Sequence, residues 1–163
     1  MLRLRNFKQE DKTLLVNYLN NPDVKRFLSP KIPSPYTIND ARWWVEEGSK
    51  VGITRAIEVD GQLAGSIGAL PGQFEYAKSA EIGYWLAKEF WGKGIAVKAL
   101  SALFNEVQLN TDIVRLHAVV FAGNTQSIKV LEKSGFEHEG LLKKAIYKQG
   151  TFCDAGVYGK IIN

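Results

Sequence analysis

Apolar and polar residues alternate along some stretches of this chain and recur at helical spacing along others. Residues 2–5 alternate as an edge strand does, whereas the apolar residues of segment 10–19 follow helical spacing and predict a helix. Residues 21–35 contain four prolines and predict an irregular connection, which we expect to face the substrate. Thr37 or Asn39 can then cap a second helix. The chain therefore begins with a strand, a helix, a proline-rich segment and another helix.

The middle of the chain changes to the pattern of strands. Residues 53–59 and 63–70 flank an Asp60-Gly61 turn, and together they predict an antiparallel hairpin. Residues 80–86 predict a third strand, which leads directly into a glycine-rich segment. This part of the chain is thus expected to form the centre of a sheet.

The remaining part of the chain mixes helices with strands. Apolar residues three and four positions apart predict a helix over residues 96–107, and an apolar run predicts a strand over residues 114–121. A further helix is predicted over residues 124–133, with Gly135 where a left-handed cap is expected. The final hairpin is predicted to pair residues 141–147 with residues 152–161 around Gly150. Hairpins combined with one strand-helix-strand crossover predict an α+β fold with a mixed sheet, in a single domain over residues 1–163.

Composition narrows the class of protein. A chain of 163 residues, 45% of them hydrophobic, is long enough to enclose a core without disulfides. Cys153 is the only cysteine, and His117 and His138 are the only histidines, so we expect a reducing compartment and no metal site. Residues 1–6 precede no apolar signal segment, and no apolar stretch reaches the ~18 residues that span a bilayer. We therefore expect a cytoplasmic protein without a membrane partner.

The net charge of +4 would suit a nucleic acid or a polyanionic cofactor. The lysines and arginines are scattered, however, and the one local enrichment, Lys143-Lys144 with Lys148, lacks the interleaved aromatic residues of a nucleic-acid platform. DNA is therefore not an expected partner, and an RNA-associated role is the weakest of the alternatives.

The glycine-rich segment Trp91-Gly92-Lys93-Gly94-Ile95-Ala96 lies between a predicted strand and a predicted helix. Small residues leave several backbone N–H groups uncovered there, and the positive end of the helix favours an anion such as a pyrophosphate. Two glycines also permit a tight turn without any ligand, and this alternative stays open. The segment lacks the Gly-Lys-Ser/Thr ending of a P-loop and the G-x-G-x-x-G of a dinucleotide site. Nucleotide hydrolysis and hydride transfer are therefore not indicated.

Two segments resemble a known family. Residues 80–86 (Ala-Glu-Ile-Gly-Tyr-Trp-Leu) followed by residues 90–96 (Phe-Trp-Gly-Lys-Gly-Ile-Ala) resemble the acetyl-coenzyme A motif of the GNAT superfamily. Residues 124–127 and 130–136 are similar to the second cofactor segment of that superfamily, and Glu139-Gly140 follows them. Tyr-Trp-Leu before a Trp-Gly-Lys-Gly loop, with a closing hairpin, resembles the RimJ/RimL-like N-acetyltransferases in particular.

This resemblance implies a twisted, mixed, mostly antiparallel sheet of about seven strands flanked by about four helices. It also implies transfer of the acetyl group of acetyl-CoA to a primary amine, by direct attack in a ternary complex. The acceptor is expected to be a protein N-terminal amine, ribosomal or other, or a small-molecule amine. Residues 9–52 shape the acceptor pocket in the superfamily, and the resemblance is weakest there. A coenzyme A-binding sensor without turnover is the alternative, and a homodimer is compatible with the sequence.

The resemblance also assigns the residues that would contact acetyl-CoA. The strand before the loop would pair its backbone with the amides of the pantetheine arm, and Trp91 stands where the superfamily usually has Gln or Arg. The residues assigned to the co-substrate are Tyr84, Trp85, Leu86, Trp91, Gly92, Lys93, Gly94, Ile95, Ala96, Asn124 and Ser127.

Two residues are candidates for the chemistry. Glu81 occupies the position of a general base in the superfamily, although a glutamate on an alternating strand is often simply exposed. Ser127 would donate to the leaving sulfur, or would instead cap the helix that follows Asn124. The tyrosine that many members use to protonate the thiolate is replaced by Leu131, and Ile146 stands near an acidic position of the branch.

Other conspicuous residues receive no chemical role. We expect one of Trp43 and Trp44 to lie in the core and the other to line a pocket. The two histidines match no position of the family motif. Cys153 is expected to pack as a small apolar residue.

Overall fold

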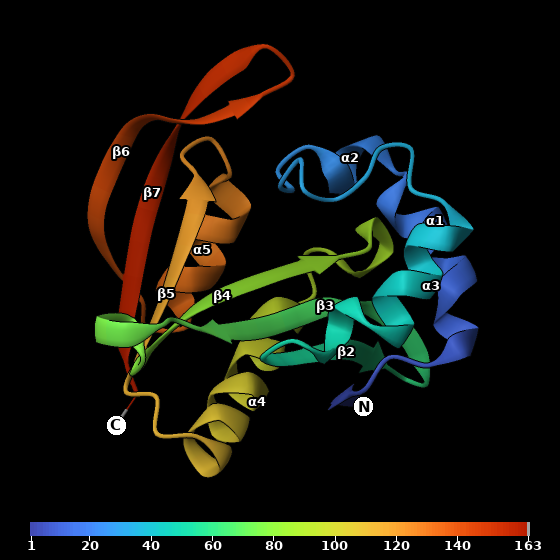
Figure 1. Ribbon diagram of the computed structural model, residues 1–163, viewed down its shortest axis with the longest axis horizontal. Helices are drawn as coiled ribbons and strands as arrows, with labels where there is room; N and C mark the ends of the chain where they lie inside the picture. The colour runs from blue at the N-terminus through green and yellow to red at the C-terminus, as the bar shows by residue number, and fades with distance from the viewer. Residues whose placement is uncertain (163) are drawn as a thin grey trace.

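The computed structural model describes residues 1–162 and contains one seven-stranded sheet with the strand order β1-β2-β3-β4-β5-β7-β6 (Figure 1). Only β4 and β5 pair in parallel, and all the other neighbours are antiparallel. The prediction of a mixed, mostly antiparallel sheet is therefore confirmed. The strands are β1 (Leu2–Arg5), β2 (Ile53–Val59), β3 (Gln62–Pro71), β4 (Ser79–Leu86), β5 (Arg115–Phe121), β6 (Glu137–Lys148) and β7 (Thr151–Ile161).

Five α-helices accompany the sheet, one of which the sequence pattern did not predict. The helices are α1 (Lys12–Leu19), α2 (Pro22–Lys25), α3 (Ile38–Glu46), α4 (Ile95–Asn110) and α5 (Thr125–Lys133). The short α2 lies where we expected only an interruption. Pro22 is at its first position, where no N–H is needed, and the Asn21 side chain accepts from the N–H of Asp23 at 2.9 Å.

The two faces of the sheet carry separate hydrophobic clusters. Helices α4 and α5 cover one face, where Leu100, Leu103 and Leu131 are fully buried. Helices α1 and α3 cover part of the other face with Leu15 and Val45. Strands β2 and β3 therefore present alternate residues to the two clusters: Ile57 and Ala64 belong to the first, and Ala56 and Leu63 to the second (Figure 1).

The two adjacent tryptophans have different surroundings. Trp44 packs against Phe7 in the cluster under α1 and α3, with ring centroids 5.8 Å apart. Trp43 is 56% exposed, so Trp44 is the member of the pair that packs in the core. The edge of Trp43 instead lies over Gly48, where an added Cβ would meet its ring at 2.6 Å. Gly48 is thus a packing position for this surface aromatic residue.

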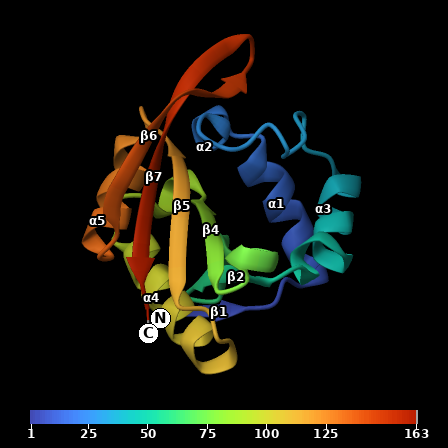
Figure 2. The same cartoon turned by 60° about the vertical axis from the view of Figure 1, so that its left-hand side comes forward.

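Strands β6 and β7 form a long hairpin that is bent near its tip. Their register breaks between Leu142 and Ile146, and Lys144 has a positive φ of 52°. The Lys144 N–H donates to Asp154 at 2.8 Å, which holds this bulge in place. Beyond the bulge the tip of the hairpin approaches the α2 segment (Figures 1 and 2).

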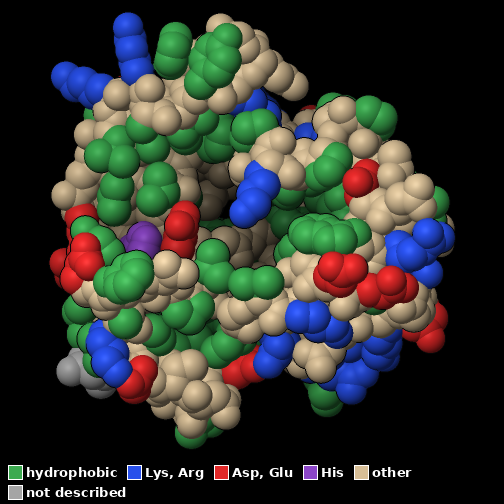
Figure 3. Space-filling view, viewed as in Figure 1, with side chains coloured by type: hydrophobic (Ala, Val, Ile, Leu, Met, Phe, Trp, Pro, Cys, Tyr) green, Lys and Arg blue, Asp and Glu red, His purple; other side chains and the backbone are tan. Residues whose placement is uncertain are grey.

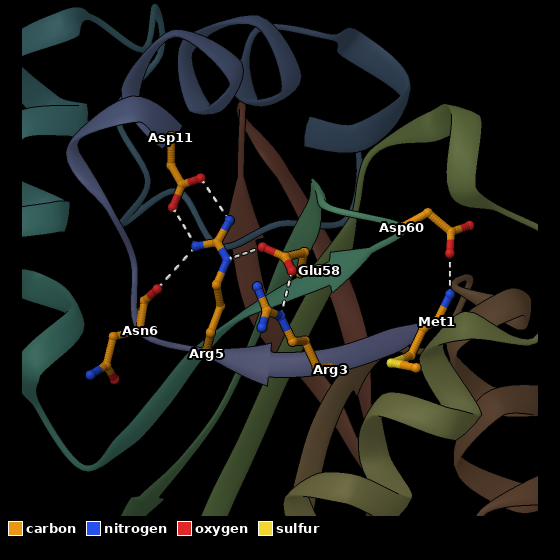
Figure 4. A network of polar contacts seen from close by, with 7 residues as sticks. All are labelled: Met1, Arg3, Arg5, Asn6, Asp11, Glu58 and Asp60. Atoms are coloured by element: carbon orange, nitrogen blue, oxygen red, sulfur yellow. Dashed lines mark hydrogen bonds and ion pairs between the residues drawn. The ribbon is translucent and has the colours of Figure 1, made fainter.

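A network of charged residues joins β1 to its surroundings (Figure 4). Arg5 donates to both oxygens of Asp11, at 2.8 and 2.9 Å, and also to Glu58 on β2. Hydrogen bonds from Arg3 and then Arg5 lower the pKa of Glu58 to about 2. Asp11 and Glu58 are buried, so their charges depend on these partners. The network fixes the first strand and the start of α1 at the edge of the sheet.

Candidate functional site

The sheet splits between its two parallel strands. Strands β4 and β5 are in register only from Ser79 to Glu81 and from Arg115 to His117. Beyond these residues the strands diverge, and the molecular surface is hollowed in this region (Figures 1 and 3). A split of this kind leaves backbone groups of both strands without a strand partner. The open edges of β4 and β5 can therefore pair with the amides of an extended ligand.

The glycine-rich loop lies at the end of β4 and leads into α4. Gly92 and Gly94 have φ values of 71° and 70°, in the left-handed region that favours glycine. No atom lies within 4 Å of a Cβ built on either residue. Gly94 is the N-cap of α4, and no side chain caps that end of the helix. The N–H groups of the first turn of α4 are therefore available to an anion, and the loop suits a pyrophosphate.

The side chains of this loop mostly point into the protein. The indole N–H of Trp91 donates to the carbonyl of Leu86 at 2.9 Å, and Ile95 and Ala96 are buried. The ammonium group of Lys93 donates to the carbonyl of Glu89 at 2.7 Å and lies over the ring of Phe90. A ligand at this loop would therefore contact mainly backbone groups. The ammonium group of Lys93 is bonded to Glu89 and does not point to the start of α4.

Tyr84 and Ser127 meet across the gap between β4 and α5. The hydroxyl oxygens of the two residues are 2.7 Å apart, and the Tyr84 hydroxyl also donates to the carbonyl of Ser127 at 3.2 Å. Burial raises the pKa of Tyr84 to about 12, although the hydrogen bond to Ser127 opposes this rise. Tyr84 is therefore protonated at neutral pH and can act as a hydrogen-bond donor.

The alternative reading of Ser127 as a helix cap is wrong. The side chain of Asn124 caps α5 by accepting from the N–H of Ser127 at 3.2 Å. The hydroxyl of Ser127 is consequently free to bond Tyr84. The sequence motif named both residues, but only the folded chain brings Tyr84 and Ser127 together.

Glu81 and His117 are neighbours on the opposite face of the sheet. They are register partners on adjacent parallel strands, so both side chains point to the same face. Glu81 is exposed and has no side-chain hydrogen bond among residues 1–162. His117 is half-buried, and its Nδ1 lies 3.2 Å from the hydroxyl of Ser79. The sequence motif gave no role to His117, because its nearness to Glu81 depends on strand pairing.

An ion pair lies beside this histidine. Arg115 donates to Glu139 at 2.8 Å, and this bond is the main cause that lowers the pKa of the Glu139 carboxyl below its usual value. The electrostatic interaction with His117 contributes in the same direction. The Glu139 carboxylate lies over Gly159, where an added Cβ would meet it at 2.3 Å. Glu139 is therefore held as a charged residue next to the Glu81 and His117 pair.

Three residues to which the sequence analysis gave no chemical role lie away from the Tyr84–Ser127 and Glu81–His117 pairs. Leu131 is fully buried in the core under α4 and α5. Ile146 pairs with Cys153 in the hairpin, and Cys153 is a free, half-buried thiol. Within residues 1–162 no cluster of three His, Cys, Asp or Glu side chains is arranged to hold a metal ion. In the same range, no helix is long and apolar enough to cross a membrane.

Comparisons of the sequence and of the fold with known proteins all find acetyltransferases. Residues 1–137 match the model of the acetyltransferase (GNAT) domain. The ribosomal-protein-serine acetyltransferase of Escherichia coli is 36% identical over 86 residues, which cover 53% of this chain and 48% of that protein. The structure of RimL, a ribosomal L7/L12 alpha-N-protein acetyltransferase, in complex with coenzyme A matches with a TM-score of 0.86 and 26% identity, over 99% of this chain and 94% of that one. MccE, a microcin C7 self-immunity acetyltransferase in complex with acetyl-CoA and AMP, matches with a TM-score of 0.84 and 25% identity, over 99% and 92% of the two chains.

Proposed function

The chain belongs to the GNAT family and is an acetyl-CoA-dependent N-acetyltransferase, and on this premise we propose that its acceptor is the free N-terminal amine of a protein or peptide. The amine attacks the thioester directly while both substrates are bound. The uncapped start of α4 beside the split between β4 and β5 is the observation that most strongly supports binding of acetyl-CoA, and hence acetyl transfer, at this site. The relatives named as ribosomal-protein acetyltransferases support a protein N-terminus as the acceptor.

The co-substrate would be held by the backbone of residues 92–96 and by the open edge of β4. The N–H groups at the start of α4 would bind its pyrophosphate, and the backbone of residues 84–86 would pair with its amides. Bound in this way, acetyl-CoA supplies the activated acetyl group. Positioning of the amine against the thioester then accounts for much of the rate, because it makes the reaction effectively intramolecular.

Glu81 is the proposed base. An amine at neutral pH is mostly an ammonium ion and must lose a proton before it can attack. Glu81 is accessible on the face opposite α4 and α5, and its carboxylate can accept this proton directly or through a water molecule. His117 lies next to it and can pass the proton on to solvent. As the new C–N bond forms, its nitrogen loses a second proton to the solvent-exchanged Glu81 carboxylate or to water. The C–S bond breaks, coenzyme A leaves as a thiolate, and the hydroxyl that protonates this thiolate regains its proton from water.

Tyr84 and Ser127 are the proposed proton source for this thiolate. Ser127 lies at the start of α5 with its hydroxyl 2.7 Å from that of Tyr84, so one hydroxyl can donate outward while the other replenishes it. A thiol has a pKa of about 8.5, so a hydrogen bond is sufficient help at neutral pH. The pair would therefore assist departure of the sulfur in place of the usual tyrosine on α5.

Ser127→Ala is expected to lower kcat by about tenfold, and Tyr84→Phe by a few-fold. Both losses lie below the roughly 10²–10⁴-fold of a full general acid, because a thiolate needs only a hydrogen bond to leave. The KM for acetyl-CoA should change little in both variants, because backbone groups hold the co-substrate. Steady-state thiol release measures these constants. If the double variant loses no more than Ser127→Ala alone, the two hydroxyls act as one unit. A larger, multiplicative loss would contradict a shared route.

The acceptor class is tested by incubating the protein with acetyl-CoA and a panel of amines. The panel contains a peptide with a free N-terminus, the same peptide with a blocked N-terminus and an internal lysine, a polyamine and an aminoglycoside. Thiol release should occur with the free N-terminus, and mass spectrometry should locate one acetyl group on it. Release only with a small amine would contradict the proposed acceptor. If the protein binds acetyl-CoA tightly but none of the amines causes thiol release, the sensor alternative is favoured.

A further inference from the structure

A cationic cavity lies between the α2 segment and the tip of the β6–β7 hairpin. Its volume is about 570 Å³, and its polar lining is formed by Lys25, Arg26, Ser29, Ser34, Lys148 and Gln149. The rest of its lining is apolar, and no acidic side chain from the described part of the chain contributes to it. Such a lining favours a ligand that is negatively charged and partly apolar.

Lys148 joins the two walls of this cavity. Its ammonium group donates to the carbonyls of Lys25, Arg26 and Leu28, at 2.8, 3.2 and 2.7 Å. It also lies 5.6 Å from the centre of the ring of Phe121 at the end of β5. Lys148 is thus used to hold the hairpin against α2, and the bulge at Lys144 is what directs the hairpin there.

Two cationic groups remain for a ligand. The ammonium group of Lys25 has the hydroxyl of Ser34 as its side-chain partner, at 2.7 Å, which leaves N–H groups unused. The guanidinium group of Arg26 is exposed and stacks on the ring of Phe27, 4.9 Å from its centre. Neither side chain has a salt bridge to an acidic residue among residues 1–162. Their charges are therefore not neutralised within the part of the fold that the structure describes.

The distance from the proposed base to the cavity can be estimated along strand β5. Phe121, which lies beneath Lys148 and 5.8 Å from the ring of Phe27, is four residues along β5 from His117. At about 3.3 Å per residue, this distance along the strand is ~13 Å. An extended peptide advances by a similar amount per residue. A peptide whose N-terminal amine lies near Glu81 would thus bring its fourth or fifth residue to the cavity.

We propose that the cavity between α2 and the hairpin tip recognises acidic side chains of the acceptor, about four residues after the amine that is acetylated. This inference rests on the proposed function, since it takes the acceptor to be a peptide. Lys25 and Arg26 would bind the carboxylates. Lys148 would keep the cavity closed, so an unstructured N-terminal tail fits better than an amine on a folded surface.

The test compares two acceptor peptides that differ only at residues three to six, with four glutamates in one and four glutamines in the other. The acidic peptide should have about tenfold higher kcat/KM at low salt, and this advantage should shrink at 0.5 M salt, because rim charges are screened. Calorimetry should give the same order of affinities without turnover. Equal kcat/KM and equal affinity for both peptides would overturn the inference.

The double variant Lys25→Gln with Arg26→Gln should lose the preference for the acidic peptide and leave the KM for acetyl-CoA unchanged. The matched control replaces Lys50 and Lys133 by glutamine, which removes the same charge from two exposed residues outside the cavity. The control should keep the preference. If the cavity variant instead raises the KM for acetyl-CoA, the cavity binds a phosphate of the co-substrate and the inference is wrong.

The outcomes separate this inference from the proposed function. If both peptides are acetylated at equal rates, the proposed function holds, but the inference that the cavity recognises acidic side chains is wrong. If neither peptide is acetylated, the proposed function fails, and the calorimetric affinities still decide whether the cavity prefers acidic chains. A phosphorylated small amine that outcompetes the acidic peptide would overturn the inference as well.

Discussion

Glu81→Gln is expected to lower kcat for acetyl transfer by about 10²–10³-fold at neutral pH, within the range that a general base contributes. The change removes the proton acceptor but keeps the size of the side chain and its place on β4. The KM for acetyl-CoA should stay the same, because the proposed co-substrate site uses backbone groups of β4 and of the start of α4, and not the Glu81 side chain. Steady-state thiol release over a range of pH measures both constants.

The control for this variant is Glu75→Gln, which changes an exposed glutamate outside the sheet. It should leave kcat unchanged. The loss in Glu81→Gln should shrink as the pH rises, because at high pH the acceptor amine is already deprotonated without help. If Glu81→Gln retains full activity while His117→Gln loses it, the base is His117. Full activity in both variants would mean that positioning alone drives the reaction.

Gly94→Val is expected to weaken the binding of acetyl-CoA by at least about tenfold. Gly94 has a φ of 70°, and this left-handed conformation costs a residue with a side chain roughly 1–2 kcal/mol. The space around its Cβ position is free of protein atoms, and it lies at the N-cap of α4 where a phosphate would approach. A valine there strains the loop and occupies the place of the anion. Calorimetric titration with coenzyme A measures the affinity.

The control variant Gly61→Val distinguishes backbone strain from loss of the coenzyme A site as the cause of weaker binding. Gly61 has a φ of 84° in the turn between β2 and β3, and no atom lies within 4 Å of its Cβ position either. Both variants should therefore lose similar thermal stability, but only Gly94→Val should lose affinity for coenzyme A. If Gly94→Val binds coenzyme A normally, the loop at residues 92–96 is a structural turn and not the pyrophosphate site.

Several elements could be predicted because their signals are local. The alternation of residues 53–59 and 63–70 around Asp60-Gly61 predicted β2 and β3 closely, since strand pairing across a short turn depends on nearby residues. Gly135 was predicted to end α5 in the left-handed conformation and has a φ of 83°. The loop at residues 92–96 was found from its glycines and from its resemblance to a family motif.

Other features depended on contacts that no local pattern encodes. The short helix α2 was missed because four residues are too few for a periodic signal, although Asn21 and Pro22 are typical starting residues. The exposure of Trp43 could not be told from its sequence, since either adjacent tryptophan fits a core. The cavity beside Lys148 joins residues more than 100 positions apart in the chain.

The sequence by itself determined the strands, the main helices, the position of the glycine-rich loop between β4 and α4, and the family, because propensity, periodicity and motif spacing act over a few residues. Only the tertiary structure decided which side chains meet. It brought Tyr84 to Ser127 across the split sheet, set His117 beside Glu81 through parallel register, and closed the hairpin on α2 through Lys148. Such contacts follow from how strands pair and where a bulge bends them, and these are properties of the whole sheet.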